Sequence, residues 1–202
     1  MHELIECSLE FCLPKVEAMI FASSRPLTLV QIEQLFRQSG YSLERTVLKS
    51  CIEVLQRACD ARAIELVEVA SGFEYRVKTD FSPWLAHMTE ERPQRYSRAL
   101  LETLALIVYR QPITRAEIEE VRGVAVSSTI LRTLLEREWI KEVGYKDVPG
   151  RPMLFATTRL FLDYFGLKNL CDLPPLEDFT HLDNVGTQLE KMLHETENTT
   201  TK

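Results

Sequence analysis

This sequence has few of the patterns that mark membrane or exported proteins. No apolar run approaches the roughly 20 residues that cross a bilayer. The first residues include Glu3, Glu6 and Glu10, where a signal peptide would be basic. We therefore expect a cytoplasmic protein that makes no membrane contact.

Cysteine and histidine are scarce and scattered. The five cysteines, at positions 7, 12, 51, 59 and 171, are odd in number and form no Cys-x-x-Cys pair, and the four histidines are far apart. Structural zinc requires clustered ligands, so we expect no metal. In a reducing compartment we predict free thiols, with Cys51 and Cys59 packed as small apolar side chains in a helix.

Catalytic motifs are also missing. The sequence contains no Gly-x-x-x-x-Gly-Lys loop, no Gly-x-Ser-x-Gly turn and no His-Glu-x-x-His. Glu119 and Glu120 are adjacent, but neighbours in a helix point about 100° apart, so we interpret them as two solvated charges. We expect no enzyme activity, no cofactor and no small-molecule substrate.

Positive charge is in short supply. The formal net charge is −6, distributed as −4 over residues 1–92, +2 over 93–166 and −4 over 167–202. Proteins dedicated to DNA binding usually have a strongly basic face, because neutralised phosphates supply most of the non-specific affinity. The balance favours a protein partner, with DNA contact weak or indirect at most.

What the sequence does contain is an internal repeat. Pro-Leu-Thr-Leu-Val-Gln-Ile-Glu at 26–33 returns as Pro-Ile-Thr-Arg-Ala-Glu-Ile-Glu at 112–119. In each copy a threonine lies three residues before Gln or Glu, which is the capping box of a helix N-terminus. Each copy precedes a longer helix and then an apparent β-hairpin. The repeat predicts a mainly α protein with small β-hairpin wings (α+β), built from two tandem winged-helix domains.

The first domain is predicted over 14–89, after a short flexible N-terminus at 1–13. Its expected helices begin at Pro14, at the Thr28 cap and at Ser42, and the third continues to about Arg62. Strands follow at 64–70 and 73–78, joined by Ser71-Gly72 as a two-residue turn, and a short helix lies near 84–88.

A linker is predicted at 90–96 and the second domain at 97–166. Helices are expected to start at Ser97, at Thr114, at Ser127 or Ser128, and at Arg159. The hairpin strands are 139–146 and 153–157, and between them Val148-Pro149-Gly150-Arg151 suits a type II turn. Residues 167–202 form an acidic, partly disordered tail, with apolar residues at helical spacing over 182–193.

The third helix of each unit bears on function, because it is the helix that enters the major groove in DNA-binding winged helices. In the second unit it offers Arg132 and Arg137, but Glu136 and Glu138 lie beside them. In the first unit, 42–62 is apolar around much of its circumference. An apolar surface this wide is expected if the helix is buried at a dimer interface, or if it lies at the centre of its own small domain.

Long stretches of the sequence are similar to a known family. They are 100–124, 134–140, 147–152, 157–167 and 172–176, with a looser match at 21–28 and 64–69. Together they resemble bacterial segregation and condensation protein B over about residues 14–178. The N-terminal extension and the tail after Asp178 lie outside the resemblance.

The resemblance implies a non-catalytic accessory subunit of a bacterial condensin, associated with the nucleoid. Such subunits are dimers that bind a kleisin (segregation and condensation protein A), and through it the SMC ATPase, in chromosome condensation and partition at cell division.

We predict that the first domain forms the homodimer and that the second contacts the kleisin. The predicted dimer residues are Val47, Cys51, Val54 and Leu55. The predicted partner-binding residues are Tyr109, Arg110, Arg115, Lys146, Asp147 and Arg151, since Arg and Tyr are favoured at interface hot spots. The alternative is a winged-helix DNA-binding transcriptional regulator.

Overall fold

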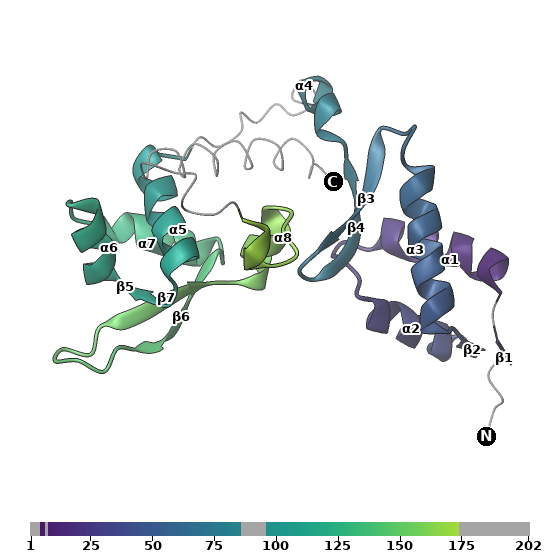
Figure 1. Ribbon diagram of the computed structural model, residues 1–202, viewed down its shortest axis with the longest axis horizontal. Coiled ribbons are helices and arrows are strands. Elements are labelled where there is room, and N and C mark those ends of the chain that lie inside the picture. Colours follow the sequence, from purple (N-terminus) through teal and green to yellow (C-terminus); the bar gives the residue numbers. More distant parts are fainter. Residues whose placement is uncertain (1–4, 7, 86–95, 174–202) are drawn as a thin grey trace. The chain divides into compact units, whose positions relative to one another are not determined.

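The computed structural model describes residues 5–6, 8–85 and 96–173, which form two compact units (Figure 1). The predicted linker at 90–96 lies outside the described residues except for Tyr96, and the apolar pattern at 182–193 lies wholly outside them. Within the described ranges, no helix is long and apolar enough to cross a membrane.

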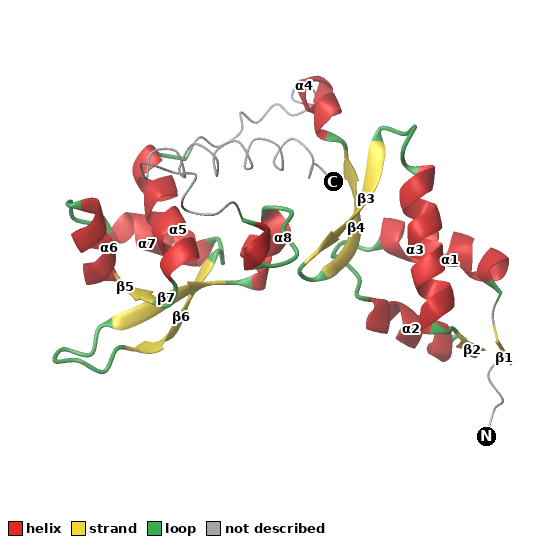
Figure 2. Ribbon diagram, viewed as in Figure 1, coloured by secondary structure: helices red, strands yellow, loops and turns green. Residues whose placement is uncertain are grey.

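The first unit has three main helices and a two-stranded hairpin (Figure 2). In chain order its elements are β1 (Ile5–Glu6), α1 (Leu9–Ala22), α2 (Leu29–Gln38), β2 (Tyr41–Ser42), α3 (Arg45–Ala58), β3 (Ile64–Val69), β4 (Gly72–Val77), the 3-10 turn η1 (Thr79–Phe81) and α4 (Ser82–Leu85). The hairpin strands β3 and β4 are antiparallel, whereas β1 and β2 pair in parallel.

The second unit repeats this order with small changes. Its elements are α5 (Arg98–Arg110), β5 (Ile113–Thr114), α6 (Arg115–Arg122), α7 (Ser128–Glu136), β6 (Ile140–Tyr145), β7 (Met153–Thr157), α8 (Arg159–Tyr164) and the 3-10 turn η2 (Leu170–Asp172). The three strands form an antiparallel sheet in the order β5-β7-β6.

The repeated phrase occupies the same place in both sheets. Leu27 pairs with Phe73 on the second hairpin strand, and Ile113 pairs with Phe155 on the corresponding strand of the second unit. Helix, short pairing segment, two helices and hairpin follow in the same order in both units. The prediction of two winged-helix units in a mainly α fold is confirmed.

Both predicted capping boxes are present. The Thr28 N–H donates to Gln31 Oε1 at 2.8 Å, and the Gln31 N–H donates to Thr28 Oγ1 at 3.2 Å. In the second copy Thr114 and Glu117 exchange the same bonds at 2.8 and 3.3 Å. Each pair gives a hydrogen-bond acceptor to two backbone N–H groups that would otherwise lack one at the start of a helix.

Helix α1 begins earlier than predicted, at Leu9 and not at Pro14. Ser8 caps it by accepting from the Phe11 N–H, and Pro14 lies inside the helix. Proline in a helix removes one backbone bond, but Cys12 and Val16 are fully buried in the core of the unit. That apolar burial offsets the lost bond, so the expectation that 1–13 is wholly flexible is wrong for residues 9–13.

Helix α3 is shorter than predicted at both ends. Ser42 does not open it, because Tyr41 and Ser42 pair with β1 and the first helical residue is Arg45. At the other end the Lys78 ammonium donates to the Cys59 and Asp60 carbonyls, both at 2.8 Å. A cation there satisfies carbonyls just past the last helical turn.

The turn of the first hairpin lies one residue earlier than predicted. Val69 pairs with Gly72, so Ala70 and Ser71 form the turn and Gly72 belongs to β4. Gly72 has φ +134°, and a Cβ there would lie 2.3 Å from the Leu27 carbonyl carbon. Glycine is needed at this position because the repeated segment lies directly against it.

The second hairpin follows its prediction closely. The Arg151 N–H donates to the Val148 carbonyl at 2.9 Å, and Gly150 has φ +84°, as the third position of a type II turn requires. One residue, Val143, forms an unpredicted bulge between Glu142 and Gly144.

Each unit has its own apolar core. The first contains Cys12, Val16, Ile20, Ile32, Phe36, Leu48, Cys51, Leu55 and Cys59, so the predicted burial of Cys51 and Cys59 is confirmed. The second is centred on α5, whose residues 103–108 are all buried, and on Trp139, which is 2% exposed. Tyr96, Tyr164 and Phe165 surround the Trp139 ring at 5.0–5.5 Å between centroids.

Candidate partner-binding surface of the second unit

A hollow of about 380 Å³ lies where α5 ends and α6 begins. It is lined by Arg110, Pro112, Ile113, Glu117, Glu120 and Val121. The first three come from the end of α5 and from β5, and the last three share one face of α6, at helical spacing i, i+3 and i+4. One wall of the hollow is therefore formed by the end of α5 and the segment that follows it, and the other wall by α6.

Gln111 fixes the wall that ends α5. Its amide nitrogen donates to the Val108 carbonyl at 3.0 Å, and its amide oxygen accepts from the backbone N–H of Thr157 at 2.7 Å. The chain then passes through the cis Gln111–Pro112 bond into Ile113, which is buried in the sheet. Gln111 thus attaches the end of the helix to the wing strand β7.

Glu117 joins the hollow to the wing. One carboxylate oxygen closes the capping box with Thr114, and the other accepts from the Lys146 ammonium at 2.6 Å. The hydrogen bond from Lys146, followed by those from Thr114, lowers the pKa of Glu117 to about 2. Glu117 therefore stays ionised with its charge compensated by Lys146, and the ion pair holds α6 to the residue that follows β6.

Arg115 faces the other side of α6. Its guanidinium donates to Glu119 Oε1 at 2.9 Å and to the Val126 carbonyl at 2.6 Å, while the Val126 N–H donates to the same Glu119 oxygen. The bond from Val126 and the pairing with Arg115 lower the pKa of Glu119. The interpretation of Glu119 as a merely solvated charge is wrong, because this carboxylate orders the loop before α7.

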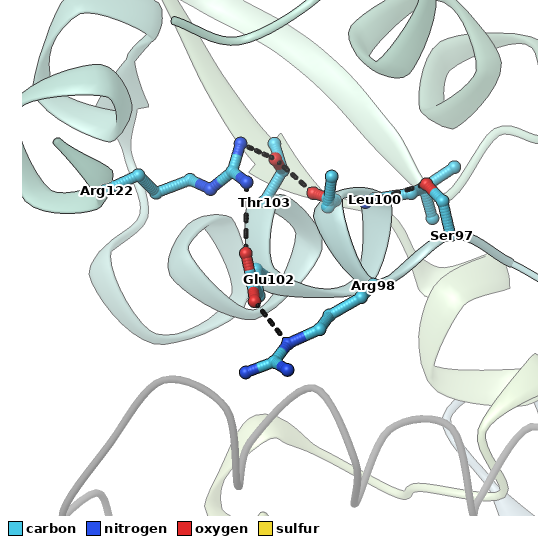
Figure 3. A network of polar contacts seen from close by, with 7 residues as sticks. Ser97, Arg98, Leu100, Glu102, Thr103 and Arg122 are labelled. Atoms are coloured by element: carbon cyan, nitrogen blue, oxygen red, sulfur yellow. Dashed lines mark hydrogen bonds and ion pairs between the residues drawn. The ribbon is translucent and has the colours of Figure 1, made fainter. Parts of the chain in front are cut away.

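A buried ion pair packs α6 against α5 (Figure 3). The Arg122 guanidinium, 7% exposed, donates to Glu102 Oε2 at 3.0 Å and to the Thr103 hydroxyl at 3.2 Å. Arg98 donates to the other Glu102 oxygen at 3.0 Å. This pair is not predictable from local sequence patterns, because its two partners are 20 residues apart.

The wing tip carries two further predicted residues, Asp147 and Arg151. Arg151 lies over the ring of Tyr145, with 5.7 Å between the guanidinium carbon and the ring centroid. Asp147 is exposed on the same turn, and Tyr145 is 57% exposed. This arrangement presents an aromatic side chain and a cation together at the surface.

The six predicted partner-binding residues do not form one cluster. Arg110 lines the hollow and Lys146 reaches it through Glu117, whereas Arg115 is bonded to the α6–α7 loop and Asp147 and Arg151 lie at the wing tip. Tyr109 is half-buried, and burial raises the pKa of its phenol. Prediction missed Glu120 and Val121, although their spacing from Glu117 already placed all three on one helix face.

The four predicted dimer residues divide into two kinds. Cys51 and Leu55 are 0% and 3% exposed, buried in the core of their own unit, because α3 packs on α1. Val47 and Val54 are half-buried and have some surface left. The width of the apolar stripe on α3 therefore reflects its central place in its own unit.

Comparison with known proteins places the chain in a family. The family model described as "Segregation and condensation complex subunit ScpB" matches residues 14–176. The chain belongs to the ScpB family. The match to the ScpB model runs through both winged-helix units.

Curated members of the ScpB family align over most of their length. A segregation and condensation protein B homolog of Coxiella burnetii is 54% identical over 179 residues, which are 88% of this chain and 85% of that protein. The Geobacillus kaustophilus protein is 48% identical over 81% of this chain and 75% of its own. A crystal structure titled ScpB from Mycobacterium tuberculosis has 30% identity, covering 80% of this chain and 98% of that one, with a TM-score of 0.37. As a ScpB family member, the chain is an accessory subunit of a segregation and condensation complex.

Proposed function

We propose that the chain is a non-catalytic accessory subunit that dimerises through its first unit and binds the kleisin of a bacterial condensin through its second. It would act at the nucleoid in chromosome condensation and partition. The observation that carries the proposal is the family match over both units, from residue 14 to 176. A subunit that links two partners needs two separate surfaces, and a tandem repeat provides them.

Exposed apolar side chains on the first unit support its proposed role in the dimer. Among its described residues Trp84 is 75% exposed, Phe21 65% and Val30 47%, and Phe11, Leu35 and Phe81 are each at least 36% exposed. Large exposed apolar side chains are typical of interaction surfaces. Val47 and Val54 would contribute from α3, with Cys51 and Leu55 supporting them from within.

The second unit supports a protein partner better than DNA. Of the two arginines on its third helix, Arg132 pairs with Glu136 at 3.5 Å, and Arg137 lies over the rings of Tyr96 and Trp139. Base reading requires arginines with clear access to a groove. Arg137 is held against these rings, and Arg132, although 72% exposed, has the acidic Glu136 beside it. This helix therefore offers at most one accessible arginine, which gives the transcriptional-regulator hypothesis little support.

The proposal is tested by light scattering during gel filtration, on the chain alone and mixed with its cognate kleisin. We expect a dimer alone and a larger complex of defined mass with the kleisin. A monomeric mass for the chain alone would contradict the proposed dimer. A peak that does not change when the kleisin is added would contradict the proposed partner.

A duplex titration at several salt concentrations, on the wild type and on R132E, K146E and R151E variants, tests the alternative. Affinity that falls steeply with salt and with each reversal would favour DNA.

A further inference from the structure

The chain enters the second unit at Tyr96, whose ring packs against the core of that unit. The centroid of this ring lies 5.2 Å from that of Trp139, which is 2% exposed. Tyr164 and Phe165 contact the same indole at 5.0 and 5.5 Å. Tyr96 is half-buried, at the edge of this aromatic group. The first described residue of the second unit is therefore attached to its core.

Arg137 holds the Tyr96 ring from a second direction. It ends α7, and its guanidinium carbon lies 4.7 Å from the centroid of the Tyr96 ring and 5.3 Å from that of Trp139. The negative face of an aromatic ring attracts a guanidinium, and more strongly where both are partly removed from water. Arg137 is half-buried. Tyr96 is thus held by an aromatic ring and by a cation, both from the segment that joins α7 to β6.

The residue after Tyr96 begins a helix. Ser97 caps α5 by accepting from the Leu100 N–H at 3.3 Å. An apolar residue directly before the cap that packs on a neighbouring apolar group fixes the angle at which the chain enters the helix. Tyr96 occupies this position. Its ring contacts therefore decide the direction of the backbone at the start of the second unit.

We propose that Tyr96, Trp139 and Arg137 form a linker anchor, which fixes the point and the direction in which the connection to the first unit leaves the second. Only residues 86–95 join Leu85 of the first unit to Tyr96. A chain of this length spans at most about 40 Å. Because the connection is short, the place where its end is fixed limits the positions that the first unit can take. The inference does not depend on which partners the two units bind.

The anchor would matter for any partner that contacts both units at once. When two binding surfaces lie on linked units, the second contact forms at an effective concentration set by the length and stiffness of the link. An end held at Tyr96 removes positions of the first unit that a freely moving end would allow. The anchor is therefore a positioning device, separate from the surfaces that bind.

Trypsin cleavage of the bond between Arg95 and Tyr96 tests the anchor on the full chain. Proteases cut segments that are exposed and locally unfolded, so a held Tyr96 protects this bond. R137M removes the cation and leaves the cleaved sequence unchanged. R132M is the matched control, because it removes an arginine of α7 that is 72% exposed. We expect R137M to speed cleavage at Arg95 about fivefold and R132M to leave it unchanged, as followed by mass spectrometry.

A second pair of variants changes Tyr96 itself. Y96A removes both ring contacts and should speed cleavage about tenfold or more, whereas Y96F keeps the ring and should change the rate far less. Each rate is divided by that of a free peptide of residues 90–101 with the same substitution, because the residue after the cleaved bond affects trypsin directly.

Small-angle scattering then tests the positioning role, which simple packing would not affect. At equal mass, Y96A should have a larger maximum dimension than the wild type, and Y96F should match the wild type. Equal cleavage rates in R137M, R132M and wild type overturn the anchor, and an unchanged scattering profile in a rapidly cleaved Y96A overturns its positioning role. If hydrogen exchange shows that Y96A loosens α5 and α7 as a whole, cleavage and scattering of R137M against R132M decide both points.

Discussion

At the scale of single residues, Glu117 connects the capping box of α6 to the wing. Its pKa in the folded chain is about 2, against an ordinary value of 4.5, chiefly because Lys146 donates to it. The folded state thus holds its proton less tightly than the unfolded state does. A lowered pKa stabilises the fold above about pH 4.5, and that stabilisation is lost as the pH falls toward 2.

We therefore predict that E117Q reduces the loss of unfolding free energy between about pH 5 and pH 2. Glutamine preserves the capping box, as Gln31 does in the first copy. K146M should reduce the same pH dependence, since it removes the principal cause of the shift. Urea denaturation across this pH range measures how the unfolding free energy depends on pH. If that dependence is as steep in E117Q as in the wild type, the prediction is wrong.

Gly72 shows how close the repeated segment lies to the hairpin. An alanine there would combine φ +134° with a Cβ only 2.3 Å from the Leu27 backbone. We predict that G72A lowers the unfolding free energy by about 3 kcal/mol. Gly40 is the control, because its φ is +85° but nothing lies within 4 Å of its Cβ, so G40A should cost only about 1 kcal/mol. Equal losses in the two variants would show that backbone conformation alone decides the effect.

At the scale of elements, the Arg122–Glu102 pair decides how α6 packs on α5. Removing one partner of a buried ion pair leaves the other uncompensated. We predict that R122M destabilises the chain by about 3 kcal/mol, and that adding E102L recovers part of the loss. R132M, which breaks the exposed pair on α7, should cost about 0.5 kcal/mol or less. Denaturant unfolding of the four proteins measures these differences, and no difference between R122M and R132M would argue against a structural role for the buried pair.

The elements also show which parts of the fold are predictable from sequence. The capping boxes and the type II turn are local, since each depends on residues no more than three apart, and both match their predictions. The pairing of β1 with β2 joins residues 36 apart through two-residue strands, which are too short to show a period. That pairing displaced the start of α3 from Ser42 to Arg45.

The candidate site also has a part that is predictable from sequence and a part that depends on long-range packing. Arg110 and Lys146 were predicted from residue type, and both belong to the hollow or to its charge network. The hollow itself depends on how α6 packs against the end of α5, which the buried Arg122–Glu102 pair fixes across 20 residues of sequence. Position within α6 alone predicts only a solvated charge at Glu120, because the wall that the end of α5 adds beside it is a long-range feature.

At the scale of the whole molecule, the two hydrophobic cores are built from separate sets of residues. Every buried residue of the first core lies between Cys12 and Phe73, and every one of the second between Leu100 and Leu167. Cooperative units of this kind open with their own free energies. We therefore predict that destabilisation stays within the unit where it is introduced.

Hydrogen exchange on the full-length chain tests this prediction with the variants already described. G72A should speed exchange in α1 and α3 and leave α5 and α7 at their wild-type rates, because Gly72 supports the first core alone. R122M should speed exchange in α5 and α7 and leave α1 and α3 at their wild-type rates. Each variant is thus the control for the other, at a similar loss of stability. If either variant speeds exchange in both units, the cores unfold as one, and the tandem repeat acts as a single cooperative body in which partner binding at one unit would stabilise the other.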